Sequence, residues 1–222
     1  MLLTPAILDK AVLSVAAHLP HRVRRPIDWR DTDESHLWRE LVASILGSAV
    51  PYEQAYRALS TLDDAGFTRI PSDLSTHRLG VEGCLRTVGY RFPASRSSHI
   101  CATSERLYGA GTTLHSFLLA CEDPMAARRR LVSACLGIGP KQASLFLRNI
   151  GYQDFAVLDR HLLAYLKFVG AIERDATAAS SIGEYERVEQ LAHKNADRLS
   201  LTQIEFDLAV WVTMRTIREV GN

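Results

Sequence analysis

Long apolar runs are missing from the 222-residue sequence, and none approaches the roughly 20 residues that a membrane-spanning helix needs. The four cysteines form no C-x-x-C pair and the eight histidines form no i, i+4 pair, so the common zinc and iron–sulfur patterns are excluded. The N-terminal stretch has no basic n-region and carries Asp9 and Lys10 within its apolar run, which favours an amphipathic helix over a signal peptide. We therefore expect a cytoplasmic protein with buried free thiols and no membrane partner.

Lysine is also scarce, since only four of the 26 basic residues are lysines, at positions 10, 141, 167 and 194. The net charge of +1 gives no global signal for a polyanionic partner. Two stretches, residues 83–104 and 124–153, nevertheless contain several basic residues and no acid. Such stretches favour a modest footprint on a polyanion, although ordinary solvated arginines would give the same pattern.

Apolar residues recur at helical spacing nearly throughout, and alternating strand patterns are almost absent. Internal repeats, low-complexity segments and linker-like stretches are absent as well, so the sequence predicts one continuous all-α protein. Short segments are expected over residues 74–90. Helices are expected near residues 4–19, 34–47, 51–66, 93–109, 113–121, 124–135, 140–151, 159–170, 181–200 and 201–220.

A turn of the form glycine–apolar–glycine, Gly137, Ile138 and Gly139, stands between two of these helices. The glycines allow a tight turn, and the amides at the start of the following helix can hold a phosphate. Two helices joined in this way can grip a nucleic-acid backbone without reading its sequence. Helix pairs also turn through glycine for structural reasons alone, so the turn by itself is weak evidence.

Lys141 lies in the first turn of the second helix, where the peptide dipoles disfavour a cation. A neutral lysine amine can attack an electrophilic carbon, whereas an arginine cannot. Asp159, eighteen residues later at the start of another expected helix, could stabilise positive charge that develops nearby. The alternative is a phosphate-contacting lysine and a plain N-cap aspartate.

The stretch LGIGPKQASLFLRNIG, followed by VLDRHLL, resembles the helix–hairpin–helix DNA glycosylase superfamily, and most of all its type 2 8-oxoguanine DNA glycosylase/AP lyases. The stretches WRELVASILGSAVPYEQA, GYRFPASRSSHI and FDLAVWV are similar to other segments of that family, so the resemblance runs from about residue 34 to 215. It implies an all-α helix–hairpin–helix glycosylase fold with two helical subdomains and the DNA-binding cleft between them. Residues 1–222 would form a single glycosylase unit, in which a helical barrel over about 34–150 ends in the hairpin. Residues 1–33 plus 151–222 would form the second subdomain.

The resemblance also implies a role for each candidate residue. Lys141 would attack the sugar C1′ of a flipped-out nucleotide and form a Schiff base, and Asp159 would stabilise the cationic sugar. The groups expected to contact DNA phosphate are Gly137, Ile138, Gly139, Arg128, Arg148 and Arg91. Trp211 would stack on the extruded base with Asp207 nearby, and His161 and Arg160 would support the site. From the residues alone, Trp211 could equally be a core residue and His161 a structural hydrogen-bonding group.

Two departures from the family pattern leave the substrate more open than the reaction. Many relatives carry an asparagine or glutamine wedge after the early barrel helix, where this chain reads GSAVPYEQ. Either Tyr52, Gln54 or another loop supplies that wedge, or discrimination of the opposite base is weak. Type 2 relatives also end at a lysine, whereas this chain ends in REVGN.

We therefore expect a bifunctional glycosylase and AP lyase that excises a damaged or modified base, with 8-oxoguanine the leading substrate. The alternatives are a glycosylase for another modified base, including hypermodified phage DNA, a non-catalytic helix–hairpin–helix DNA-binding protein, and a helical interaction module with no nucleic-acid role. The expected partner is double-stranded DNA containing a modified base, bound by a monomer associated with the nucleoid. No iron–sulfur cluster is expected, because all four cysteines precede Asp159, and no resident metal or cofactor beyond an alkali ion at the hairpin backbone.

Overall fold

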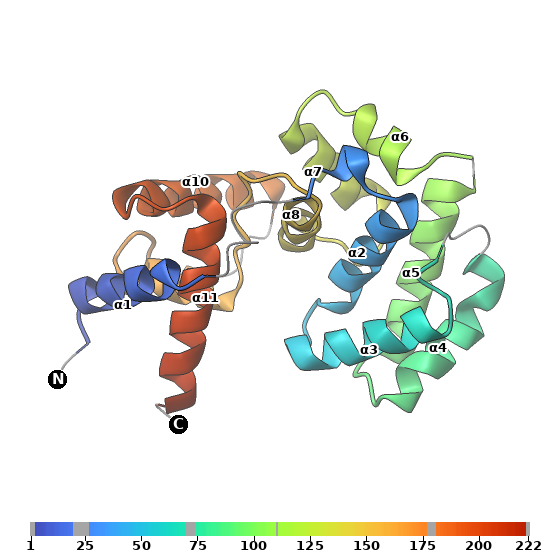
Figure 1. Ribbon diagram of the computed structural model, residues 1–222, viewed down its shortest axis with the longest axis horizontal. Coiled ribbons are helices and arrows are strands. Elements are labelled where there is room, and N and C mark those ends of the chain that lie inside the picture. Colours follow the sequence, from blue (N-terminus) through green and yellow to red (C-terminus); the bar gives the residue numbers. More distant parts are fainter. Residues whose placement is uncertain (1–2, 20–26, 70–73, 110, 177–180, 221–222) are drawn as a thin grey trace. The chain divides into compact units, whose positions relative to one another are not determined.

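The computed structural model describes residues 3–19, 27–69, 74–109, 111–176 and 181–220, and every regular element in these ranges is a helix (Figure 1). The predicted all-α class is therefore confirmed. The chain divides into two compact units. One comprises residues 1–26 and 152–222, and the other comprises residues 27–151. The chain end Gly221–Asn222 and part of the charged loop after the first helix lie outside the described residues.

In its described residues, the unit built from both chain ends contains four helices around one apolar core. They are α1 (Pro5–Ala17), α9 (Arg160–Phe168), α10 (Ile182–Arg198) and α11 (Gln203–Val220). Helix α11 packs against α1 and α9, as Figure 1 shows for α1. The core gathers Leu8, Leu166 and Phe206, and Tyr165 stacks edge-on against Phe206 with ring centroids 5.4 Å apart. This core holds α9 in place, and Asp159 lies at the N-terminus of that helix.

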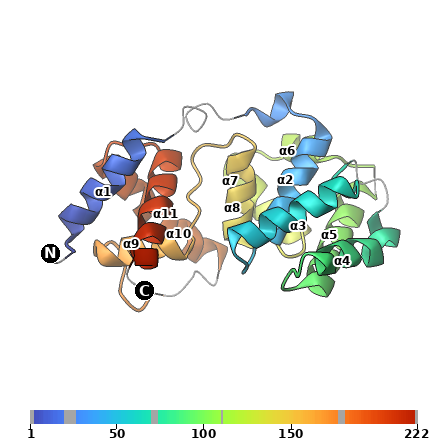
Figure 2. The same cartoon turned by 60° about the horizontal axis from the view of Figure 1, so that its bottom comes forward.

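The other unit holds the remaining helices, arranged around α2. They are the 3₁₀ turns Trp29–Asp31 and Leu74–His77, and α2 (Glu34–Leu46), α3 (Tyr52–Asp64), α4 (Arg78–Thr87), α5 (Pro93–Tyr108), α6 (Leu114–Leu119), α7 (Pro124–Ala134) and α8 (Pro140–Asn149). Helix α2 packs against α3, α5 and α8, and α8 also packs against α7 (Figure 2). The central helix therefore links the hairpin formed by α7 and α8 to the rest of the unit.

Glu34, the first residue of α2, ties three helices together. Its carboxylate accepts hydrogen bonds from the Tyr108 hydroxyl at 2.7 Å, from the Leu114 amide at 2.6 Å and from His115 Nδ1 at 2.7 Å. Burial acts to raise the pKa of Glu34, but these donors outweigh it and hold the pKa below its ordinary value. The carboxylate thus fixes the starts of α2 and α6 to the end of α5.

One element departs from the prediction. Residues 78–87 form the ten-residue helix α4, where only short segments were expected. Gly80 and Gly83 lie inside it, and each costs about 1 kcal/mol of helix propensity relative to alanine. The buried side chains of Val81 and Leu85 offset that cost by packing into the unit.

The four cysteines are all free, as predicted, but only Cys101 and Cys135 are buried. Burial raises the pKa of Cys101 to about 11 and that of Cys135 to about 12, so both are protonated and unreactive near neutral pH. Cys84 and Cys121 are half-buried, against the prediction that all four are buried. A bilayer-spanning helix is not found in the described part of the chain.

Candidate functional site

The turn between α7 and α8 uses its two glycines for different reasons. Gly137 has a φ of 77°, and a Cβ atom there would lie 2.5 Å from Nδ1 of His99, so the fold itself requires glycine. Gly139 has an ordinary φ of −96°, and a Cβ atom there would meet no atom of the described chain within 4 Å. The second glycine therefore leaves a bare backbone at the N-cap of α8, where an external group can approach the first amides of the helix.

Lys141 is the second residue of α8 and is half-buried. The next residue, Gln142, is buried and donates a hydrogen bond from Nε2 to the carbonyl oxygen of Ser44, near the end of α2. Because α8 begins at Pro140 and is anchored at Gln142, the backbone of Lys141 is held between two fixed points. The first helical turn carries the positive end of the helix dipole.

The predicted phosphate-contacting arginines do not behave alike. Arg128 is fully buried, donating to the Ser144 hydroxyl at 3.1 Å and approaching the sulfur of Met125 at 3.5 Å. Its guanidinium ties α7 to α8 and is not on the surface where a phosphate would bind, so the prediction for Arg128 is corrected. Arg91 is exposed, with its guanidinium carbon 4.9 Å from the centre of the Phe92 ring. Arg148, half-buried in the last turn of α8, lies about 10 Å along the helix axis from Lys141.

Asp159 is the N-cap of α9, as predicted. Its Oδ1 accepts hydrogen bonds from the backbone amides of His161 at 2.8 Å and Leu162 at 2.9 Å. No hydrogen bond from the described residues to its second oxygen, Oδ2, is found. A half-buried carboxylate held in this way is oriented by one oxygen and can present the other to a ligand.

The four residues before Asp159, from Phe155 to Leu158, are buried and lie outside any regular helix. Three successive amides of this segment donate to side chains of α10 and α11. The acceptors are Glu189 for Ala156 at 3.0 Å, Asp207 for Val157 at 2.7 Å and the Tyr185 hydroxyl for Leu158 at 3.1 Å. The Tyr185 hydroxyl in turn donates to the carbonyl oxygen of Ala156 at 2.7 Å. These side chains fix the backbone of the segment and therefore set the position of Asp159.

Asp207, which was expected near the extruded base, belongs to this set of contacts. Its side chain is buried, and both carboxylate oxygens are engaged within the unit. Oδ2 accepts from the Val157 amide, and Oδ1 accepts from Gln203 Nε2 at 2.7 Å. Asp207 positions the segment that leads to Asp159.

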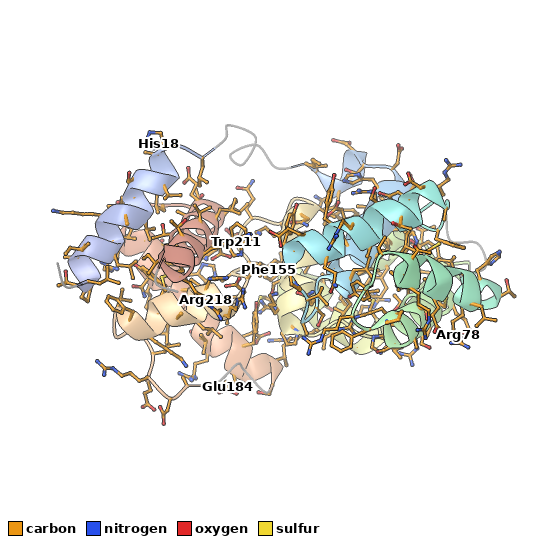
Figure 3. The ribbon with its side chains drawn as sticks, turned by 90° about the horizontal axis from the view of Figure 1, so that it is seen from below. His18, Arg78, Phe155, Glu184, Trp211 and Arg218 are labelled. Atoms are coloured by element: carbon orange, nitrogen blue, oxygen red, sulfur yellow. The ribbon has the colours of Figure 1, made fainter. Side chains whose placement is uncertain are left out.

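Trp211 lies half-buried on α11 and packs beside the first turn of α9 (Figure 3). Its ring centre is 6.2 Å from that of His161 at an angle of 71°, and the Arg215 guanidinium carbon lies 5.1 Å from the ring centre. Arg160 Nε donates to His161 Nε2 at 3.2 Å, which leaves the imidazole proton on Nδ1. Trp211 is thus neither fully in the core nor isolated on the surface.

The charge around His161 is strongly positive. Burial lowers the pKa of His161, the carboxylate of Asp159 opposes this shift, and the guanidinium groups of Arg160, Arg218 and Arg215 lower the pKa further. The imidazole is therefore neutral near pH 7, and the surrounding cations are arginines. This face of the unit suits a polyanion and contains the half-buried Trp211.

Several residues of these sites were not found from the sequence. Glu189 and Tyr185 contact residues 156–158 only through the fold, and no local pattern identifies them. Arg215 and Arg218 could have been found, because they follow Trp211 by four and seven residues on one helix and so share its face. In the described ranges, no group of three or more His, Cys, Asp or Glu side chains is arranged to hold a metal ion.

The bare glycine turn, the lysine in the first turn of α8 and the aspartate capping α9 together define the helix–hairpin–helix class of DNA glycosylases. Comparison with known proteins identifies the family within this class. The profile of the 8-oxoguanine DNA glycosylase family matches residues 23–201, and the chain belongs to that family.

Similar proteins agree with this membership. The 8-oxoguanine DNA glycosylase/AP lyase of Saccharolobus solfataricus is 30% identical over 182 residues, which cover 81% of this chain and 83% of that protein. Among solved structures, the 8-oxoguanine DNA glycosylase of Thermotoga maritima has a TM-score of 0.78 and 28% identity, over 93% of this chain and 95% of that one. The Methanocaldococcus jannaschii 8-oxoguanine glycosylase/lyase, in complex with a 15mer DNA containing 8-oxoguanine, has a TM-score of 0.71 and 25% identity, over 93% and 88% of the two chains.

Proposed function

We propose that this protein is a bifunctional DNA glycosylase/AP lyase that excises 8-oxoguanine from double-stranded DNA through a Schiff base on Lys141. The observation that carries the proposal is the position of Lys141, directly behind a bare glycine turn and in the first turn of α8. The chain uses arginine for 22 of its 26 basic residues, and only a lysine can serve as an amine nucleophile. Family membership and the names of the relatives support the substrate and the lyase step.

The chemistry would proceed on a nucleotide turned out of the duplex, because the target bond is inaccessible inside the stack. The neutral amine of Lys141 attacks C1′ while the N-glycosidic bond breaks and the base leaves with the bonding electron pair. Asp159 stabilises the positive charge on the sugar and accepts the proton that the lysine nitrogen releases. Opening of the sugar ring gives an iminium, and removal of a C2′ proton then expels the 3′ phosphate by β-elimination and nicks the strand.

The remaining groups would hold the substrate in position. The α8 amides behind Gly139 bind a backbone phosphate, with Arg91 as an exposed cation of the same unit. Trp211 stacks on the extruded base, and the arginines around His161 attract the neighbouring phosphates. We propose that the protein acts as a monomer on nucleoid DNA.

Borohydride trapping tests the Schiff base directly, because hydride reduction converts the iminium into a stable covalent link. Wild-type protein should be trapped on a duplex containing 8-oxoguanine, and Lys141→Gln should abolish trapping and base release while retaining DNA binding. Lys194→Gln removes the same charge from an exposed site on α10 and should behave like wild type. Trapping of Lys141→Gln at the wild-type rate would show that another amine is the nucleophile. A panel of duplexes with one modified base each would show whether 8-oxoguanine is the preferred base.

A further inference from the structure

A guanidinium group lies over the ring of Trp211. The guanidinium carbon of Arg215 is 5.1 Å from the ring centre, and Arg215 follows Trp211 by four residues, so the two side chains lie on one face of α11. Both side chains are half-buried. Arg218, seven residues after Trp211, lies on the same face of the helix (Figure 3). The ring that is proposed to stack on the extruded base is therefore accompanied by a cation whose planar fork of N–H donors can reach the edge of that base.

The carboxylate of Asp159 and these cations lie around one imidazole ring, that of His161. Asp159 Oδ1 accepts a hydrogen bond from the backbone amide of His161 at 2.8 Å, and the His161 ring meets Trp211 edge-on with the ring centres 6.2 Å apart. The imidazole carries no charge near neutral pH, because burial and the surrounding guanidinium groups lower its pKa. A negative charge at the start of α9 and the positive charges of Arg215 and Arg218 on α11 are thus gathered at one site without a charge on the ring among them.

Breaking an N-glycosidic bond separates charge in a way that this arrangement matches. Both bonding electrons leave with the base, which becomes an anion, and the sugar carbon is positive until the Lys141 amine has bonded to it. A carboxylate stabilises the sugar, and a guanidinium group stabilises the base. Because an arginine stays protonated, it stabilises the anion without giving up its own proton, and the base takes a proton from water after it has left.

We propose that Arg215 is a further catalytic residue, which contacts the base stacked on Trp211 and stabilises the negative charge that the base carries as it leaves. The inference rests on the proposed function and adds to it a group that acts on the base, whereas Lys141 and Asp159 act on the sugar. The stabilisation is strongest in the transition state, because the base carries little negative charge before the bond stretches.

The charge of Arg215 favours one chemical class of base. It favours a base that leaves as an anion and offers carbonyl oxygens or ring nitrogens as acceptors for the guanidinium donors. 8-Oxoguanine, with carbonyl oxygens at C6 and C8, belongs to this class. Purines that an alkyl group has made cationic leave as neutral bases and gain nothing from a positive charge beside them.

Two substitutions of Arg215 test the role of its charge. Arg215→Met removes the charge but keeps a long side chain to pack on Trp211, and Arg215→Lys keeps the charge. Single-turnover release of 8-oxoguanine from duplex DNA should be slowed by about 10- to 100-fold in Arg215→Met, somewhat less than for a fully buried oxyanion donor because Arg215 is half-buried. Arg215→Lys should recover most of that rate. Arg187→Met is the matched control, since it removes the same charge from an exposed site on α10 and should release the base like wild type.

Two further readouts separate this role from a structural one. Cleavage of a preformed abasic site should be slowed much less than base release in Arg215→Met, because no base leaves in that reaction. In a Lys141→Gln background, which binds without turnover, Arg215→Met should lower the affinity for the 8-oxoguanine duplex by a smaller factor than it lowers the rate of base release, because the anion forms only as the bond breaks.

Release of 8-oxoguanine by Arg215→Met at the wild-type rate would overturn the inference. Equal slowing of base release and abasic-site cleavage would overturn it too, because Arg215 would then act through the structure around Asp159. A loss of affinity as large as the loss of rate would show that Arg215 only binds the substrate, which also contradicts the inference. If wild-type protein neither releases a base nor is trapped by borohydride, the proposed function fails and the inference falls with it, whereas the outcomes above refute the inference alone.

Discussion

Replacing Asp207 by alanine should destabilise the unit that carries Asp159. The change leaves two buried donors, the Val157 amide and Gln203 Nε2, without the carboxylate that accepts from both at 2.7 Å. Each buried donor left unsatisfied costs about 1–3 kcal/mol, so the loss should total about 2–6 kcal/mol. That is a large share of the about 5–15 kcal/mol that stabilises a typical domain.

Asp207→Asn provides the matched control. Its amide oxygen can still accept from Val157, and its NH₂ group can donate to Oε1 of Gln203 once that side-chain amide rotates. The variant should therefore lose only the difference between charged and neutral hydrogen bonds, about 1 kcal/mol for each bond.

Urea unfolding, base release and cleavage of a preformed abasic site should be measured on both variants. Asp207→Ala should lower the urea midpoint and slow both reactions, because the segment that positions Asp159 is loosened. Asp207→Asn should recover most of each. If Asp207→Ala keeps the wild-type midpoint and loses only base release, the side chain contacts the base and the positioning role is refuted.

Three further predictions follow from the described geometry. Gly137→Ala should destabilise the protein by at least about 1–2 kcal/mol, because alanine is strained at positive φ and its Cβ would collide with the His99 side chain. Gly139→Ala should change stability by less than about 0.5 kcal/mol but weaken DNA binding. Urea unfolding would measure the first effect, and filter binding would measure the second. The lowered pKa of His161 means that the unfolded chain binds a proton before the native one does, so stability should fall as pH drops below the ordinary value of 6.5 and level off below the native pKa. Urea midpoints across that range should decline less for His161→Gln, and an equal decline would contradict the assignment. Arg91→Gln should reduce the log–log salt slope of DNA binding by about 1, whereas Arg128→Gln should leave the slope unchanged and lower stability.

Local signals in the sequence predicted most of the helices and the two central residues of the proposed site. Pro140 and Gly151 bracket α8, and Asp159 caps α9, because caps and breakers act within a few residues of the helix ends that they determine. Long-range contacts could not be predicted from such local signals. Asp207 lies fifty residues from Val157, and the pattern of α11 alone does not show that its carboxylate holds that amide.

Arg128 is an intermediate case between helix ends, which local signals predict, and long-range contacts, which they do not. It stands in a run of three arginines that look alike, and only the helical phase relative to Ala127 and Leu131 marks one of them as facing inward. Its partner, Ser144, is sixteen residues away on the next helix. A polar residue at the edge of an apolar face is ambiguous until the packing partner is known.

The amides of residues 156–158 restrict how the chain can change length. Each successive amide meets a different side chain, so the segment has a single register. One residue inserted after Phe155 would shift Asp159 along the chain and exchange the partner of every amide. An insertion ahead of Phe155, where Gln153 and Asp154 are exposed, would leave that register intact. Length variants of this chain should therefore differ before Phe155 and keep a constant number of residues from Phe155 to Asp159.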